Sequence, residues 1–167
     1  MKKTKNAYLK LLAILIVTVL TTGCVRMIHQ YSPQKAPNWK NDAFTYPFKY
    51  QCNGAEIGVY PLEVYPVGVD KPSLAIDIHN PKGQEACDLS FLWLENKQTG
   101  QRMNPIKVET LYYNDKMTTV CSYSFDIRED KNVRYNLHFS DQLLGCPIDP
   151  IPYVFEKTWE IPFQEVM

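Results

Sequence analysis

The feature that most constrains the fold of this chain is a recurring alternation of apolar and polar residues. In residues 133–140, VRYNLHFS, every second residue is apolar, and residues 118–127, TTVCSYSFDI, follow the same period. Because successive side chains of a strand point to opposite faces, this period predicts strands with one buried face. The polar segment 128–132 between the two runs predicts that they form a hairpin.

Further candidate strands occur throughout the rest of the folded region, and turn-forming segments such as NPKG and KQTG separate several of them. Apolar residues on both faces of residues 86–96 predict a strand that is covered on both sides at one end. The pattern predicts an all-β domain over residues 44–167, an antiparallel sandwich or barrel of about seven to eight strands. The additional candidate strands are 46–52, 56–60, 73–79, 104–113 and 153–161.

The amino terminus has the composition of a secretory signal peptide. Residues 1–23 contain four lysines and no acidic residue, and an uncharged apolar run occupies residues 11–20. That run is shorter than the ~20 residues that span the hydrocarbon core of a bilayer. The order of basic, apolar and small residues therefore predicts a leader that is removed, in preference to a transmembrane anchor.

Residues 20–24, LTTGC, resemble the lipobox of bacterial lipoproteins, with Thr21 at the position where leucine is most usual. The resemblance implies cleavage before Cys24 and attachment of acyl chains such as palmitate to its thiol and its new amino group, which anchors a protein stably. Val25 after the cysteine implies the outer membrane over the inner membrane. The domain would then face the periplasm or the cell surface.

Residues 24–43 show neither helical nor strand periodicity, and two prolines, Pro33 and Pro37, interrupt them. We therefore expect a flexible tether after the lipidated cysteine, which fully extended would reach about 60 Å. Tyr31 and Trp39 in this segment are expected either to rest at the lipid interface or to pack on the domain.

Four cysteines remain in the exported part, namely Cys52, Cys87, Cys121 and Cys146. An even number in an oxidising compartment predicts two disulfides, although four cysteines allow three pairings. The shortest loops favour Cys52–Cys87 with Cys121–Cys146. No two of these cysteines are spaced like zinc ligands, so no metal site is predicted.

Charge and motifs argue against several functions. Without residues 1–23 the chain has 14 basic and 18 acidic residues, a net charge of −4, so nucleic acid is not an expected partner. Nucleophile-elbow, metalloprotease and phosphate-loop motifs are absent from the sequence. The three histidines, His29, His79 and His138, are expected to be solvated. No catalytic residue and no cofactor are therefore predicted.

Two features leave other functions open. Asp77 and Asp88 lie on the polar faces of candidate strands, where a carboxylate-based hydrolase site would need such groups. Tyr112 and Tyr113 are adjacent and must point to opposite faces of a strand, so one of them is a candidate for an outward binding surface.

Residues 48–61, FKYQCNGAEIGVYP, resemble the opening of the membrane-bound lysozyme inhibitors, which are small bacterial lipoproteins with a β-barrel fold. The shared features are an aromatic-x-Cys, a small polar turn and a short strand. The resemblance implies inhibition of a cell-wall hydrolase. The nearest counterpart of the family's inhibitory Ser-Gly-x-x-Tyr segment is residues 98–103, QTGQRM, with Met103 in place of the tyrosine.

The sequence thus predicts a non-enzymatic lipoprotein of the bacterial cell envelope with a binding or structural β domain. Its expected partners are the membrane, through acyl chains on Cys24, and a protein of the envelope. The alternatives are an inhibitor of a cell-wall hydrolase and a hydrolase with an unrecognised carboxylate site.

Overall fold

The computed structural model describes residues 26–41, 47–64, 71–82, 86–112 and 117–160. The chain divides into two compact units. One is His29–Lys157, which contains the core, both disulfides and the candidate sites described below. The other unit consists of Met1–Ile28 and Thr158–Met167. Its described residues are 26–28 in the first strand and 158–160 in the last strand. The elements are β1 Arg26–Pro33, β2 Phe48–Cys52, β3 Ala55–Val64, β4 Ser73–His79, η1 Leu89–Phe91, β5 Leu92–Asn96, β6 Arg102–Met103, β7 Lys107–Tyr112, β8 Thr118–Ser124, β9 Arg134–Phe139 and β10 Ile151–Glu160.

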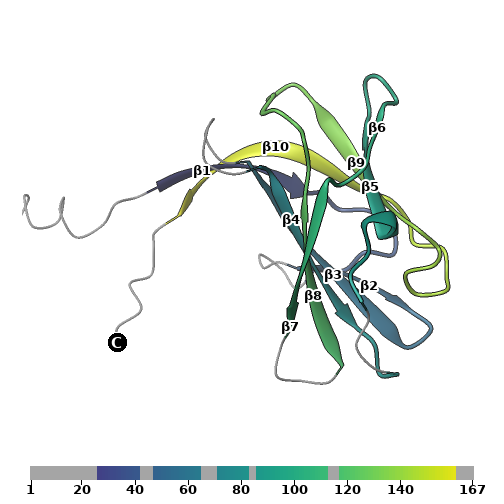
Figure 1. The fold of residues 1–167 in the computed structure, drawn as a ribbon. Helices are drawn as coiled ribbons and strands as arrows, with labels where there is room; N and C mark the ends of the chain where they lie inside the picture. The colour runs from purple at the N-terminus through teal and green to yellow at the C-terminus, as the bar shows by residue number, and fades with distance from the viewer. Residues whose placement is uncertain (1–25, 42–46, 65–70, 83–85, 113–116, 161–167) are drawn as a thin grey trace, which may run out of the picture. The chain divides into compact units, whose positions relative to one another are not determined.

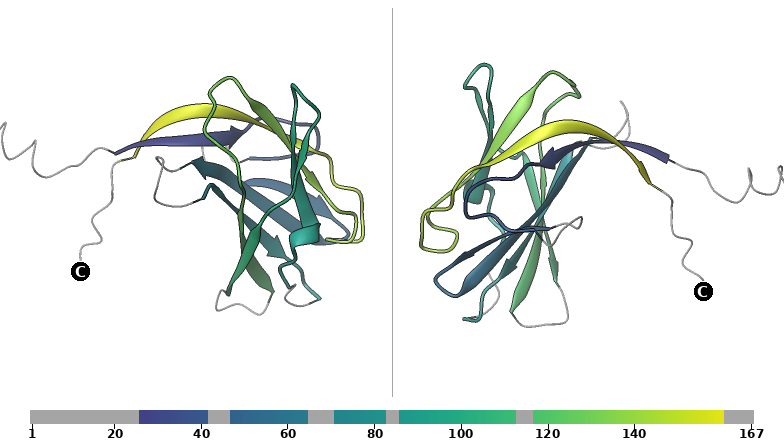
Figure 2. Two further views of the ribbon diagram at one scale, coloured as in Figure 1. Left: turned by 45° about the horizontal axis from the view of Figure 1, so that its top comes forward. Right: turned by 180° about the vertical axis from the view of Figure 1, so that it is seen from behind.

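The strands belong to one sheet in the order β6-β5-β9-β10-β1-β3-β4-β8-β7, and β2 pairs with β3 beside this path. The strand pairs whose registers are described are antiparallel. Within His29–Lys157 the sheet curls into a half-barrel. Figures 1 and 2 show β3, β4, β8 and β7 side by side, with the curved strand β10 passing across to the group of β9, β5 and β6. The predicted all-β, antiparallel fold class is confirmed.

The β2–β3 hairpin turns on Asn53 and Gly54, which have positive φ angles of 52° and 81°. Two such residues form the tight turn that matches the twist of antiparallel strands, and Asn-Gly is its preferred sequence. Along β3, residues 55–59 pair with β2 and residues 62–64 pair with β1. The register of β3 with β4 shifts between Val59 and Leu62, where Pro61 cannot donate a ladder hydrogen bond.

The core is a cluster of buried apolar side chains from most of the strands, and the predicted inward faces of two strands are confirmed. The apolar residues at alternate positions of 118–127 and 133–140 are buried, apart from the partly buried Val133. Burial of each apolar side chain of this size contributes ~1.5–3 kcal/mol to the free energy of folding relative to exposure, so these faces stabilise the curved sheet. The buried members of the two faces are Cys121, Tyr123, Phe125, Ile127, Tyr135, Leu137 and Phe139.

The predicted hairpin between residues 118–127 and 133–140 is wrong. β8 pairs with β4 and β7, whereas β9 pairs with β5 and β10. The connection crosses from one group of strands to the other because Phe125 and Ile127 are buried and hold its first part against the core. The Tyr31 hydroxyl also accepts from the Asp130 N–H and donates to the Asp130 carbonyl, at 3.0 and 2.8 Å.

The predicted strand 86–96 begins later than expected. Its first half contains the 3₁₀ helix η1, where the Asp88 carboxylate accepts a hydrogen bond from the Ser90 N–H at 2.7 Å. β5 then buries Leu92 and Leu94 and turns Trp93 to the outer face. This strand is therefore buried on one face only.

The tether predicted over residues 24–43 is wrong for residues 26–40. Residues 26–33 form β1, and Tyr31 and Trp39 are only 0% and 5% exposed. Periodicity fails to reveal β1 because it lies between β10 and β3, where polar as well as apolar residues are buried. The Gln30 side-chain amide donates a 2.9 Å hydrogen bond to the Ser32 hydroxyl there, so each of these buried polar groups has a partner.

Two disulfides are present, as predicted, but with a different pairing. Cys52 bonds Cys146, and Cys87 bonds Cys121. The expectation based on the shortest loops is wrong because strand placement, not separation along the chain, brings cysteines together. Cys52 ends β2 beside the 145–146 turn, where the Asn53 amide contacts the Gly145 carbonyl.

Both disulfides should stabilise the domain, and the longer loop should matter more. The loops span 94 and 34 residues. The chain-entropy model then expects losses of about 4.7 kcal/mol for Cys52→Ala with Cys146→Ala and about 3.8 kcal/mol for Cys87→Ala with Cys121→Ala. Urea unfolding monitored by circular dichroism gives both values. Peptide mapping without reduction is the accompanying check, and recovery of a Cys52–Cys87 peptide would contradict the pairing.

Candidate functional site

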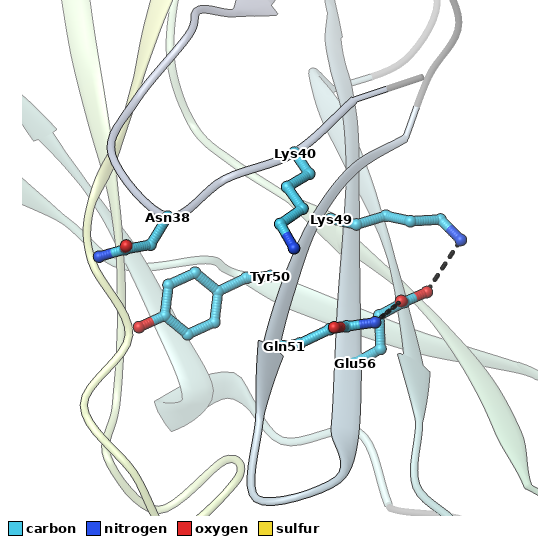
Figure 3. A pocket seen from close by; sticks show the side chains of 6 residues that line it. All are labelled: Asn38, Lys40, Lys49, Tyr50, Gln51 and Glu56. Atoms are coloured by element: carbon cyan, nitrogen blue, oxygen red, sulfur yellow. Dashed lines mark hydrogen bonds and ion pairs between the residues drawn. The ribbon is translucent and has the colours of Figure 1, made fainter.

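A pocket of about 540 Å³ opens where the segment 36–41 passes beside β2 and the β2–β3 hairpin (Figure 3). Most of its lining is polar, and one aromatic ring borders it. The side chains that line it are Asn38, Lys40, Lys49, Tyr50, Gln51 and Glu56.

The segment 36–41 is held in place by the buried side chain of Trp39. Its indole N–H donates to the Asp149 carbonyl at 2.9 Å, and the Asn38 amide donates to the Asp149 carboxylate at 2.6 Å. Lys40 and Lys49 exchange two backbone hydrogen bonds of 2.9 and 2.7 Å. This short ladder fixes Lys40 directly opposite Lys49, and the Lys40 amine points into the pocket (Figure 3).

The carboxylate of Glu56 is the acceptor of the pocket. It pairs with the Lys49 ammonium at 2.9 Å and accepts from the Gln51 amide at 2.9 Å. Burial by itself would raise the pKa of Glu56, but these two hydrogen bonds outweigh it and hold the pKa below its usual value. Glu56 is therefore charged at neutral pH.

A second carboxylate, Asp77, lies on the neighbouring strand β4. It accepts a 2.7 Å hydrogen bond from the Tyr60 hydroxyl. Pro47 lies over Gly58 beside it, since a Cβ on Gly58 would approach the Pro47 ring to 3.0 Å. Burial raises the pKa of Asp77 above its usual value, and the Tyr60 hydrogen bond offsets this only in part. Asp77 is thus engaged by its neighbours, whereas Glu56 faces the pocket.

A different surface occupies the outer face of β5, β6 and β9. The Trp93 indole stacks on the His138 ring with centroids 5.2 Å apart and planes within 5°. The Arg102 guanidinium lies 4.1 Å from the Trp93 ring centroid, a cation–π contact. The His138 Nε2 contacts the Glu95 carboxylate at 2.6 Å. We call these four residues, Trp93, Glu95, Arg102 and His138, the outer cluster.

The three histidines differ in their surroundings. His79 is exposed and contacts the Thr118 hydroxyl at 3.1 Å. His29 contacts the Glu129 carboxylate at 2.8 Å, and His138 belongs to the outer cluster. Two of the three therefore have carboxylate partners and are not simply solvated.

The remaining predicted site residues have varied outcomes. Cys24, Tyr113 and the side chain of Tyr112 lie outside the described residues. Asp88 caps η1, and hydrogen bonds from Ser90 lower its pKa. Residues 98–103 form the turn from β5 into β6 and bring Arg102 over Trp93.

The pocket residues were not found from the sequence. Asn-Gly at 53–54 is the signal that could have placed Gln51 opposite Glu56, because it specifies a two-residue hairpin turn. For Lys40, which was assigned to the tether, the sequence contains no such signal.

No protein-family model, no curated protein and no solved structure matches this chain. Across the described ranges, no three histidine, cysteine, aspartate or glutamate residues gather as they would around a metal ion. In that same part of the chain, no helix is long and apolar enough to cross a membrane.

Asp77→Asn should stabilise the protein at neutral pH. Because the folded-state pKa of Asp77 is raised, the wild type loses stability as pH rises from the unfolded to the folded pKa. Asparagine avoids this loss and still accepts from Tyr60. The gain should shrink at pH values under the unfolded-state pKa, because the wild-type carboxyl group is then protonated in both states. Urea unfolding at pH 7 and pH 3 measures it; an equal gain at both would contradict the titration.

Proposed function

We propose that this chain is a lipid-anchored, non-enzymatic binding protein of the bacterial envelope, attached to the outer membrane through Cys24. The leader composition and the LTTGC segment support the anchor. The observation that carries the binding function is the outer cluster, in which a large aromatic side chain is held on the outer face of the sheet.

The outer cluster has the properties of an energetic centre in a protein interface. Tryptophan and arginine dominate such centres, and binding is favoured when their side chains are already ordered. Trp93 is ordered by His138 from β9 and by Arg102 from β6. The Arg102 Nε donates to Asn104 at 2.9 Å, which leaves the outer N–H groups of the guanidinium for a partner carboxylate. The expected partner is thus an envelope protein with an acidic contact surface.

Inhibition of a cell-wall hydrolase is a second candidate, because the 98–103 turn adjoins the outer cluster at the β6 end of the sheet. The β2–β3 hairpin also has the aromatic-x-Cys and polar turn of the lysozyme-inhibitor resemblance. Mixing the protein with lysozyme at equal molar amounts should then suppress lysis of cell-wall substrate. Undiminished lysis at a tenfold excess of this protein would exclude lysozyme as the target.

Lipid attachment is tested at Cys24. Cells expressing the wild type and supplied with labelled palmitate should incorporate label into the protein, and Cys24→Ala should abolish incorporation. Cys146→Ala is the control, since it removes a disulfide-bonded cysteine of the folded domain and should retain the label. Label on the Cys24→Ala protein would refute the proposed anchor.

Loss of the Trp93 side chain should release the protein partner. Chemical crosslinking in intact cells followed by affinity purification identifies a partner, whose affinity is then measured with the purified protein. Trp93→Ala should weaken binding by at least about thirtyfold, the equivalent of 2 kcal/mol at an interface centre. Lys82→Ala, on the exposed 81–82 turn, is the matched control and should bind normally. Equal affinities for the wild type and Trp93→Ala would remove the outer cluster from the interface.

A further inference from the structure

We infer that the pocket between segment 36–41 and β2 binds a saccharide that carries an acidic group. This inference goes beyond the proposed function, because it concerns a different surface and a different class of ligand. It rests on the charge of the pocket, its hydrogen-bonding groups and its aromatic wall.

The first argument is the charge of the two lysines that pair through their backbones in the Lys40–Lys49 ladder. Glu56 pairs with Lys49 and offsets one of the two positive charges. The Lys40 amine, which points into the pocket (Figure 3), adds the second. An anionic group placed against Lys40 would pair with this charge, so the pocket favours a ligand with a negative charge.

The second argument is the mixture of donors and acceptors around the pocket. Lysine ammonium and amide groups donate hydrogen bonds, whereas the Glu56 carboxylate and the Gln51 amide oxygen accept them. Hydroxyl groups do both, so a ligand with several hydroxyls matches this lining. A simple inorganic anion would use the donors and leave the charged Glu56 carboxylate as a repulsive neighbour. The lining therefore suits a sugar that carries one acidic group.

The third argument is that the pocket is preorganised. The Tyr50 ring borders it (Figure 3), packs against the Trp39 ring at 5.3 Å and contacts the Pro147 carbonyl through its hydroxyl at 3.3 Å. Trp39 is itself fixed by Asp149. A flat apolar ring in a fixed position can cover the C–H face of a sugar without losing further side-chain entropy.

The test is isothermal titration of the full-length acylated protein in detergent micelles with glucuronate, glucose and inorganic phosphate. Glucuronate should bind at least tenfold more tightly than either glucose or phosphate. Lys40→Ala should weaken glucuronate binding at least tenfold, while its backbone ladder to Lys49 remains. Lys97→Ala, an exposed lysine on the β5–β6 turn, is the matched control and should bind glucuronate like the wild type.

The outcomes separate the possibilities. Equal binding of glucuronate and glucose would overturn the acidic requirement, and equal binding of glucuronate and phosphate would overturn the saccharide. Absence of glucuronate binding to the wild type, or unchanged binding to a folded Lys40→Ala protein, would overturn the assignment of the pocket. Trp93→Ala should keep glucuronate binding. This variant therefore distinguishes a failure of the saccharide proposal from a failure of the proposed protein interface at the outer cluster.

Discussion

The structure depends on how the edge of β3 is divided. One edge of this strand pairs with β4, and the other pairs first with β2 and then with β1. Tyr60 and Pro61 lie between the residues that pair with β2 and those that pair with β1, and the register of β3 with β4 shifts at the same place. Through β1 the sheet continues to β10 and on to β9, β5 and β6. Without this division the two groups of strands would have no shared ladder.

The division of β3 also creates the pocket. Because β1 and β2 share one edge, the chain between them must pass beside the hairpin, and Trp39 fixes its path by burial and by its hydrogen bond to Asp149. Lys40 then meets Lys49 across a short ladder. The Cys52–Cys146 disulfide joins the end of β2 to the loop before β10, so the strands around the pocket are also linked covalently. A rigid surround of this kind suits recognition of a ligand.

The two candidate surfaces differ in how far sequence reasoning could reach them. Trp93 and Arg102 lie close in the chain on either side of a turn, so local reasoning identified the segment but not their contact. His138 comes from a strand expected to pair elsewhere, and only the β5–β9 ladder places it on Trp93. Lys40, Lys49 and Glu56 come from three separate segments, namely 36–41, β2 and β3, and line one pocket. Pairing across such distances depends on which apolar faces bury together, which local periodicity does not encode.

By itself the sequence determined the class of the fold, the inward faces of β8 and β9 and the presence of two disulfides. The first two follow from the alternation of apolar and polar residues along short segments, and the third follows from the number of cysteines. Only the tertiary structure decided that Arg26–Pro33 is a strand, that β8 and β9 lie apart and that Cys52 meets Cys146. The physical reason is common to all three, because strand pairing depends on which apolar faces are buried in a shared core. The segment Gln30–Ser32 contains polar residues, yet it forms a strand because it pairs in the sheet between β10 and β3.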